Sequence, residues 1–131
     1  KPLKISSPPG CSIVLMAGAL GKVYLSQMDD DEVSRIVKKR GLPQYTKASI
    51  VDEHIFMKEI VRVRQSGYAL DNGEYLSGVN AIAIGLGNHY GQQLALWAVG
   101  FAESFHSEKI KAVKETIMTS ADKLRKTLKT N

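Results

Sequence analysis

Few side chains in this 131-residue sequence have the types and spacings that chemistry requires. A metal centre needs several nitrogen, sulfur or oxygen ligands at reachable spacings. The histidines His54, His89 and His106 are isolated from one another, and the single cysteine, Cys11, lies elsewhere in the chain. No serine stands in a nucleophile elbow, and nothing couples Cys11 to a particular histidine. The sequence therefore predicts no catalytic residue, no metal and no cofactor.

The glycine-rich stretch GLGNHYG, residues 85–91, does not indicate phosphate binding either. A dinucleotide site needs its glycines between a strand and the helix that follows. Here they separate two apolar stretches that are typical of strands, so the segment is predicted to be a hairpin connection.

A ligand pocket is suggested instead by the small side chains of two late strands. If side chains alternate, Val79, Ala81, Ala83 and Gly85 share one face of the first strand. On the second strand, one face carries Leu94, Leu96, Ala98 and Gly100. If the two small faces lie on the same side of the sheet, they leave a volume that something must fill.

Two interpretations of that volume stay open at this point. In the first, a helix packs closely on the small residues. In the second, the space is a buried pocket with Asp71 or Asn72 at its mouth as an orienting polar group, because ligand cavities are mostly apolar with few polar anchors. Glu74, in the same turn, could contact a ligand or accept hydrogen bonds from backbone amides, and we favour the amides.

The elements that must position these residues are predicted from periodicity, caps and turn residues. Acidic residues begin the segment DDDEVSRIVKKRG and basic residues end it, which complements a helix dipole, and Gly41 is expected to form a left-handed cap. Asp52 is expected to cap a helix that buries Phe56, Ile60 and Val63 and ends at Gly67. Further predictions are an edge strand at Leu3–Ser6, a short helix within residues 17–28, strands at Tyr68–Asp71, Val79–Leu86 and Gln93–Phe101, a loop at Gly87–Gly91 and a final helix at Ser107–Leu128. The predicted fold class is α+β, with helices packed against a mainly antiparallel sheet.

Composition is that of one ordinary globular domain, with 44% apolar and 24% charged residues. The net charge of +5 is spread over helix ends and the C-terminal segment, which gives little support for nucleic-acid binding by this chain. No apolar run approaches the roughly 20 residues that span a bilayer, and no signal peptide is evident, so we expect a cytoplasmic protein.

Three segments resemble the effector-binding domain of IclR-type bacterial transcriptional regulators. They are AGALGKVYLSQM (17–28), RGLPQYTKASI (40–50) and RQSGYALDNGEYLSGVNAIAI (64–84). Each is weak alone, but their order and spacing match over essentially the whole chain. The resemblance implies a GAF-like fold, self-association as a dimer or tetramer, and a small effector bound over the sheet. It also implies that residues 1–131 form an effector-binding domain without its front part and without the winged helix-turn-helix domain that binds operator DNA.

Carried over position by position, the resemblance implies a set of effector-binding residues that includes the small face described above. The set is Ile13, Ala19, Leu20, Asp71, Val79, Ala81, Leu96, Ala98 and Gly100.

One departure from the family bears on the effector. Members that recognise small oxo-acids place hydroxyl or thiol side chains where this chain has Ala81, Ala98 and Gly100. Because a buried carboxylate needs several hydrogen bonds to offset its desolvation, the loss of these donors favours a larger or more apolar effector, such as an aromatic or sugar-derived acid.

Function is therefore predicted as ligand sensing and oligomerisation within a transcriptional regulator and not as catalysis. Two alternatives from other classes stay open. One is an enzyme domain on a similar scaffold that acts on a small acid, and the other is a dimerisation module that binds no ligand.

Overall fold

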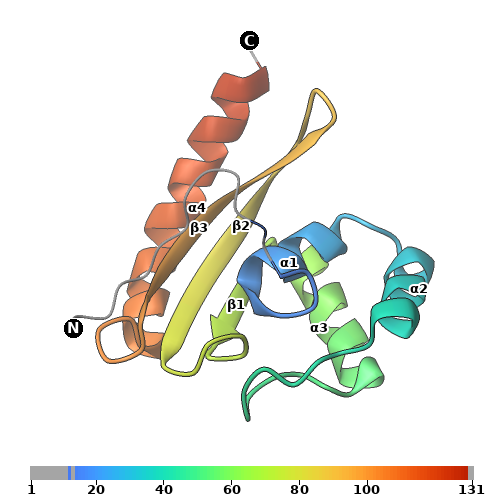
Figure 1. Cartoon of the computed structure of the whole chain (residues 1–131). Coiled ribbons are helices and arrows are strands. Elements are labelled where there is room, and N and C mark those ends of the chain that lie inside the picture. The colour runs from blue at the N-terminus through green and yellow to red at the C-terminus, as the bar shows by residue number, and fades with distance from the viewer. Residues whose placement is uncertain (1–11, 13, 130–131) are drawn as a thin grey trace.

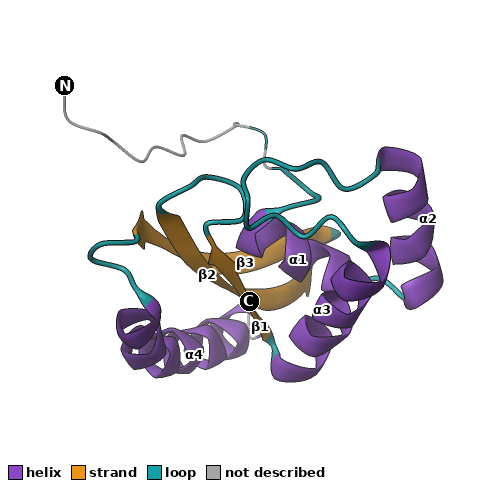
Figure 2. Ribbon diagram, turned by 90° about the horizontal axis from the view of Figure 1, so that it is seen from below, coloured by secondary structure: helices purple, strands orange, loops and turns teal. Residues whose placement is uncertain are grey.

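A three-stranded sheet lies between helices in the computed structural model, which describes residue 12 and residues 14–129. The elements in chain order are α1 (Gly18–Ser26), α2 (Asp30–Arg40), α3 (Glu53–Ser66), β1 (Tyr68–Asn72), β2 (Val79–His89), β3 (Gln92–Phe101) and α4 (Ser107–Lys129). Helices α1 and α3 lie on one face of the sheet, α4 lies on the other, and α2 packs outside α1 and α3 (Figures 1 and 2). This arrangement confirms the predicted α+β fold class.

The sheet has the order β1-β2-β3, and both neighbouring pairs are antiparallel. The predicted loop at Gly87–Gly91 is shorter than expected, because β2 continues to His89 and pairs there with Gln92. Tyr90 and Gly91, which form the two-residue connection, both have positive φ. That backbone matches the twist of a tight hairpin and favours glycine at one of its positions.

Of the two glycines that were expected to end helices in the left-handed conformation, Gly67 does so and Gly41 does not. Asp52 caps α3 by accepting a hydrogen bond from the Ile55 N–H, and Gly67 ends that helix in the left-handed conformation. Gly41 also has a positive φ of 74°, but its ψ of −178° is extended, so the expected left-handed cap of α2 was wrong. The chain instead leaves α2 directly into an extended loop.

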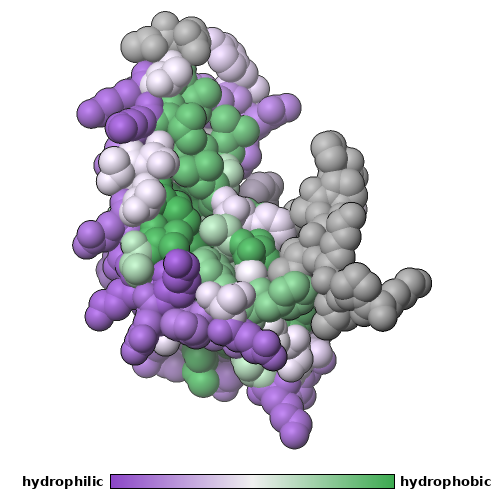
Figure 3. Space-filling view, turned by 90° about the vertical axis from the view of Figure 1, so that its left-hand side faces the viewer, coloured by the Kyte–Doolittle hydropathy of each residue, from purple (hydrophilic) through white to green (hydrophobic). Residues whose placement is uncertain are grey.

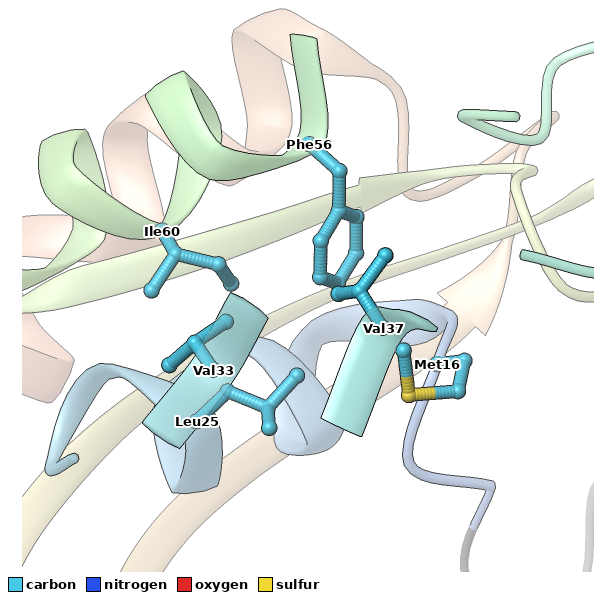
Figure 4. Packing of buried hydrophobic residues seen from close by; sticks show 6 residues of the cluster. All are labelled: Met16, Leu25, Val33, Val37, Phe56 and Ile60. Carbon is cyan, nitrogen blue, oxygen red and sulfur yellow. The ribbon is translucent and has the colours of Figure 1, made fainter. Parts of the chain in front are cut away.

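Three helices form an apolar cluster away from the sheet (Figure 4). Leu25 of α1, Val33 of α2 and Ile60 of α3 are fully buried, and Met16, Val37 and Phe56 complete the cluster. Burial of side chains of this size contributes roughly 1.5–3 kcal/mol each. The cluster holds α1 against α3 and so determines the position of the helix that covers the sheet.

Helix α1 packs directly on the small residues of the sheet. Ala19 and Val23 contact Ala69, Ala81 and Ala83, which are 0–2% exposed. A Cβ atom added at Gly85 would stand 3.2 Å from a methyl carbon of Val23, so the helix passes close to the strand there. Over this part of the sheet, close helix packing is therefore the correct one of the two interpretations of the small face.

The register between β2 and β3 corrects the expected shared face. Ala81 pairs with Val99 and Ala83 pairs with Trp97, so these residues point to the α1 side. Ala98 pairs with Ile82 and Gly100 with Asn80, which places both on the α4 side. The small residues of the two strands thus lie on opposite faces of the sheet and not above one common volume.

A β-bulge is the physical reason for this difference. The register at the turn, with His89 opposite Gln92, would place Gly100 opposite Ala81 if the ladder were regular. The register shifts between Gly85 and Gly87. Because side chains alternate, a shift of one residue moves every later residue of β3 to the other face.

The predicted edge strand at Leu3–Ser6 lies outside the described residues. Among those that the structure describes, no helix has the length and apolarity needed to cross a membrane.

Candidate functional site

The predicted effector-binding residues divide between the two faces of the sheet. Five of them lie on the α1 side, namely Ala19, Leu20, Asp71, Val79 and Ala81. Leu96, Ala98 and Gly100 lie on the α4 side, where Leu96 packs near Ile84 and Ala121. A Cβ atom at Gly100 would stand 2.7 Å from the Cβ of Phe105, so this glycine allows the loop before α4 to approach the strand. Ile13 lies outside the described residues.

On the α1 side, β3 presents large apolar residues and not the predicted Ala98 and Gly100. Val99 lies opposite Ala81 and is half-buried, and Trp97 is 38% exposed. Phe101, opposite Val79, is also partly exposed. The face that carries Asp71 therefore has an apolar and partly aromatic surface along β3.

Asp71 is the buried polar group on this face. It pairs with Ala81 across the sheet and is 7% exposed. Its Oδ1 accepts a hydrogen bond of 2.7 Å from the Glu74 N–H, and its Oδ2 lies beside Gly18 at the start of α1. Burial raises the pKa of Asp71 above its ordinary value, and the nearby Glu74 carboxylate adds to that rise, although the amide hydrogen bonds oppose it. The carboxyl group is thus held at a helix start in a poorly solvated position.

A charged cluster that the sequence did not reveal lies beneath this turn. The Lys22 side chain is 2% exposed, and its Nζ lies 2.8 Å from Glu59 Oε2, from Glu74 Oε1 and from the Leu70 carbonyl oxygen. Arg62 also pairs with Glu59, through a contact of 2.7 Å. Burial acts to raise the pKa of Glu59, but the hydrogen bonds from Arg62 and Lys22 outweigh it and lower this pKa from 4.5 to about 2.

The turn that follows β1 is also fixed from the side of the loop between α2 and α3. Thr46 Oγ1 donates to the Gly73 carbonyl at 2.7 Å, and Ser49 Oγ donates to the Glu74 carbonyl at 2.6 Å. The rings of Tyr45 and Tyr75 meet edge to face, with centroids 5.0 Å apart. Glu74 itself accepts from the Asn72 N–H at 3.1 Å, so the favoured role of Glu74 as a partner for backbone amides is confirmed.

A cavity of about 450 Å³ lies between α1, the segment before it and the start of β3. This volume is in the usual range of small-molecule sites. Leu20 lines it, whereas Asp71 and Ala81 do not. Its lining is Val14, Leu15, Leu20, Gly21, Val23, Tyr24, Gln27, Arg40, Gln93, Leu94 and Ala95. Asp71, the predicted polar anchor, and this cavity therefore lie at different places along α1. Leu20 is both a predicted effector-binding residue and part of the cavity lining.

A larger open cleft of about 800 Å³ lies at the C-terminal end of α1, beside the bulge and the C-terminal part of α4. Two arginines that line it have protein partners. Arg64 bonds to two carbonyl oxygens and to Asp30, and Arg125 bonds to Asp122 and to the Gly85 carbonyl. Because these guanidinium groups hold the fold together, the cleft is a weaker candidate for a binding site.

No three acidic, histidine or cysteine side chains come together as a metal site within residues 14–129 or at residue 12. The predicted effector role of the named residues stays a prediction.

The sequence could not show that Ala98 and Gly100 lie on the α4 side, because the β-bulge that places them there has no local signal. For the Lys22 cluster, in contrast, the sequence contains two signals. Glu59 and Arg62 have the i,i+3 spacing of a helical ion pair, and Lys22 is a charge within a small and apolar helix segment.

Comparison with known proteins gives a consistent result. The family model described as "Bacterial transcriptional regulator IclR C-terminal" matches residues 1–126. The HTH-type transcriptional repressor AllR of Salmonella typhi is 31% identical over 93 residues, which are 71% of this chain and 34% of that protein. The transcriptional repressor IclR of Escherichia coli K12 is 27% identical over 81 residues, 62% of this chain and 30% of that protein. The matched part of the chain thus spans about a third of the length of these relatives.

Solved structures agree in fold. The inducer-binding domain of the PobR transcription factor from Acinetobacter, a double mutant in complex with 3-hydroxybenzoic acid, is 29% identical with a TM-score of 0.77, and the match covers 93% of this chain and 73% of that one. The IclR protein of Thermotoga maritima is 25% identical with a TM-score of 0.82, and the match covers 98% of this chain and 52% of that one.

Proposed function

Because this chain belongs to the IclR family of bacterial transcriptional regulators, as a match to its C-terminal domain over residues 1–126 shows, we propose that it senses a small organic acid. In the proposal, the bound effector shifts an equilibrium between arrangements of the subunits, and this shift reaches a separate N-terminal domain that binds operator DNA. Residues 1–131 act as the ligand-sensing domain and have no catalytic role.

One observation carries the assignment of the site: Asp71 is a buried carboxyl group on an otherwise apolar sheet face. Few buried polar groups in apolar surroundings are the usual make-up of a ligand site. Asp71 lies across β2 from Val99, with Ala81 between them, and Leu20 and Val99 both pack against the cluster of α1 and the sheet. In the proposal, the effector donates a hydroxyl hydrogen to Asp71 and places its apolar body along β3. Because α1 packs on Ala81 between these groups, binding there requires α1 to move away from Ala81.

An aromatic or sugar-derived acid fits this proposal better than a small oxo-acid. Trp97 and Val99 offer apolar contact, and apart from the indole N–H of Trp97 they offer no hydrogen-bond donor for the carboxylate of a small oxo-acid. The PobR domain, which is similar to this chain, binds 3-hydroxybenzoic acid, an acid with a ring and a hydroxyl group.

The proposal is tested by calorimetric titration of the purified chain with 3-hydroxybenzoate, glyoxylate and pyruvate. We expect 3-hydroxybenzoate to bind most tightly. Asp71→Asn keeps the shape of the side chain and should weaken binding roughly 10- to 100-fold, since a hydrogen bond to a charged group contributes roughly 1.5–3 kcal/mol. Asp122→Asn, on the exposed side of α4, is the matched control and should leave the affinity unchanged.

Tighter binding of glyoxylate or pyruvate would contradict the preference for an aromatic acid. Equal affinity of the Asp71 variant and the Asp122 variant would remove Asp71 from the site. Turnover of any of the three acids would instead favour the enzyme alternative.

Self-association is part of the proposed function, and β3 is the surface we propose for it. This strand is at the edge of the sheet in the described part of the chain, and residues 92–101 contain no charged residue and no proline. Edge strands that remain free usually carry such residues, which prevent pairing with another strand. A hydrophobic band also runs along the side of the molecule where β3 and α4 lie (Figure 3).

A second copy of the chain is the proposed partner of this edge. When two identical strands pair antiparallel around a two-fold axis, each residue meets a residue of the same uncharged segment, so no like charges oppose one another.

A further inference from the structure

The side chain of Lys22 has a complete set of partners deep inside the protein. An ammonium group has three N–H donors. Here they match three acceptors, each 2.8 Å away: Glu59 Oε2, Glu74 Oε1 and the carbonyl oxygen of Leu70. Because the side chain is only 2% exposed, water cannot replace any of these partners cheaply.

The three acceptors come from three different parts of the fold. Glu59 belongs to α3, Leu70 to β1, and Glu74 to the turn after β1. The charges balance, because Lys22 and Arg62 face the carboxylates Glu59 and Glu74. A buried ion cluster of this kind is strongly destabilised when one partner is removed, since an uncompensated charge is left behind.

A short chain of hydrogen bonds leads from Lys22 to Asp71. The carboxylate of Glu74 that Lys22 holds also accepts from the Asn72 N–H at 3.1 Å. The backbone N–H of the same glutamate donates to Asp71 Oδ1 at 2.7 Å. The conformation of the turn, and with it the place of the Asp71 carboxyl group beside Gly18, thus depends on where Glu74 is held.

We propose that Lys22 is a positioning residue that fixes the turn Asn72–Tyr75 through Glu74 and thereby holds the Asp71 carboxyl group in the geometry that binds the effector. The second half of this statement rests on the proposed function, whereas the first half concerns the free protein and can be tested without a ligand.

The competing explanation is that Lys22 merely joins α1 to α3. Arg64 provides a matched control for it, because this arginine also joins α3 to α1, but at the far end of α1. Arg64 donates to the carbonyl oxygens of Ser26 at 3.1 Å and Met28 at 2.7 Å, and to Asp30 at 2.9 Å. Loss of either cation removes a link between the two helices, and only the loss of Lys22 removes the link to the Asp71 turn.

The first measurement is amide hydrogen exchange by NMR on Lys22→Met and Arg64→Met, with the Ile60 amide of α3 as an internal reference for overall stability. We expect the Glu74 amide, relative to Ile60, to exchange at least tenfold faster in K22M than in R64M. Equal relative exchange in the two variants would overturn the proposal.

Lys22→Met leaves two carboxylates without their ammonium partner, so a milder variant is needed in case this one does not fold. Glu74→Gln removes one carboxylate oxygen and leaves the Lys22–Glu59 pair intact. It should also raise the relative exchange of the Glu74 amide above that of Arg64→Met, by a smaller factor than K22M. Exchange equal to that of Arg64→Met would count against the proposal.

The second measurement is the affinity for 3-hydroxybenzoate. The proposal expects at least a tenfold loss in Lys22→Met, or in Glu74→Gln if the first does not fold, and less than a twofold change in Arg64→Met. Faster Glu74 exchange without a loss of affinity would overturn the binding half. If the wild-type chain does not bind this probe, the proposed effector class fails, and the exchange experiment still decides whether Lys22 positions the turn.

Discussion

At the scale of single residues, the half-buried carboxyl group of Glu59 and the buried carboxyl group of Asp71 have opposite pKa shifts. Burial acts to raise the pKa of both Glu59 and Asp71. For Glu59, two cations donate hydrogen bonds to the carboxylate and reverse the effect of burial. Asp71 receives backbone amides and lies near another carboxylate, so its pKa stays raised. Ionisation of Glu59 therefore favours folding, whereas ionisation of Asp71 costs stability.

This contrast predicts the acid sensitivity of the fold. A carboxyl group whose folded pKa is depressed contributes stability above its unfolded pKa and loses it as the pH falls through the folded pKa. For Glu59 the window lies between 4.5 and about 2. Urea unfolding across this window should show that wild type loses about 2 to 3 kcal/mol more than Glu59→Gln. Glu115→Gln, which changes an exposed residue of α4, should lose as much as wild type, and a wild-type-like loss in the Glu59 variant would refute the prediction.

At the scale of elements, one irregular residue position in β2 determines which side chains face α1. The bulge between Gly85 and Gly87 lets β2 pair with β3 through Ala81 and Val99 and not through Ala81 and Gly100. Gly87 has a φ of +90°, a conformation that glycine adopts without the steric cost of a side chain. Trp97, Val99 and Phe101 thereby lie on the α1 side of β3. Ala98 and Gly100 lie on the α4 side, together with Leu96.

Engineered disulfides test this register in a background with Cys11 replaced by serine. Val79→Cys with Phe101→Cys should form a disulfide on oxidation, because these residues are direct partners. Val79→Cys with Ala102→Cys, the partner in a regular ladder without the bulge, should keep most of its free thiols. Titration of thiols after oxidation distinguishes the pairs, and the reverse result would show that the bulge is absent.

At the scale of the whole molecule, the two faces of the sheet are covered to different degrees. Helices α1 and α3 cover the part of one face that β1 and β2 form, where Ala69, Ala81 and Ala83 are 0–2% exposed. In α4, the buried residues are Ile110 and Ala121. Trp97 and Phe101, on the α1 side of β3, are 38% and 36% exposed, and Leu124 of α4, on the other side of the sheet, is 38% exposed. Partly exposed apolar residues on one strand face, such as Trp97 and Phe101, commonly mark interaction surfaces.

Self-association through β3 is therefore predicted to respond to a single charge. Sedimentation velocity of the purified chain should show a dimer or larger species, and Ala95→Lys on β3 should shift it toward monomer, because edge lysines oppose strand pairing. Thr116→Lys adds the same charge on an exposed part of α4 and should leave the distribution unchanged. A monomeric wild type, or the same shift for both variants, would contradict this surface.

The sequence by itself determined the elements and much of their packing. Helix and strand segments, the Asp52 cap, the left-handed Gly67 and the α+β class follow from local patterns of charge, apolar spacing and turn residues. Such signals lie within a few residues of one another, so they can be read directly. The quoted motifs also indicated the family that residues 1–126 match.

Only the tertiary structure decided which residues share a face and which charges meet. The bulge changed the side of Ala98 and Gly100, and alternation could not detect it, because one inserted residue leaves both strand patterns intact. Lys22 meets Glu59 across 37 positions of sequence, which no local pattern specifies. Both outcomes depend on how distant elements dock, and docking is determined by the summed packing of the helices on the sheet.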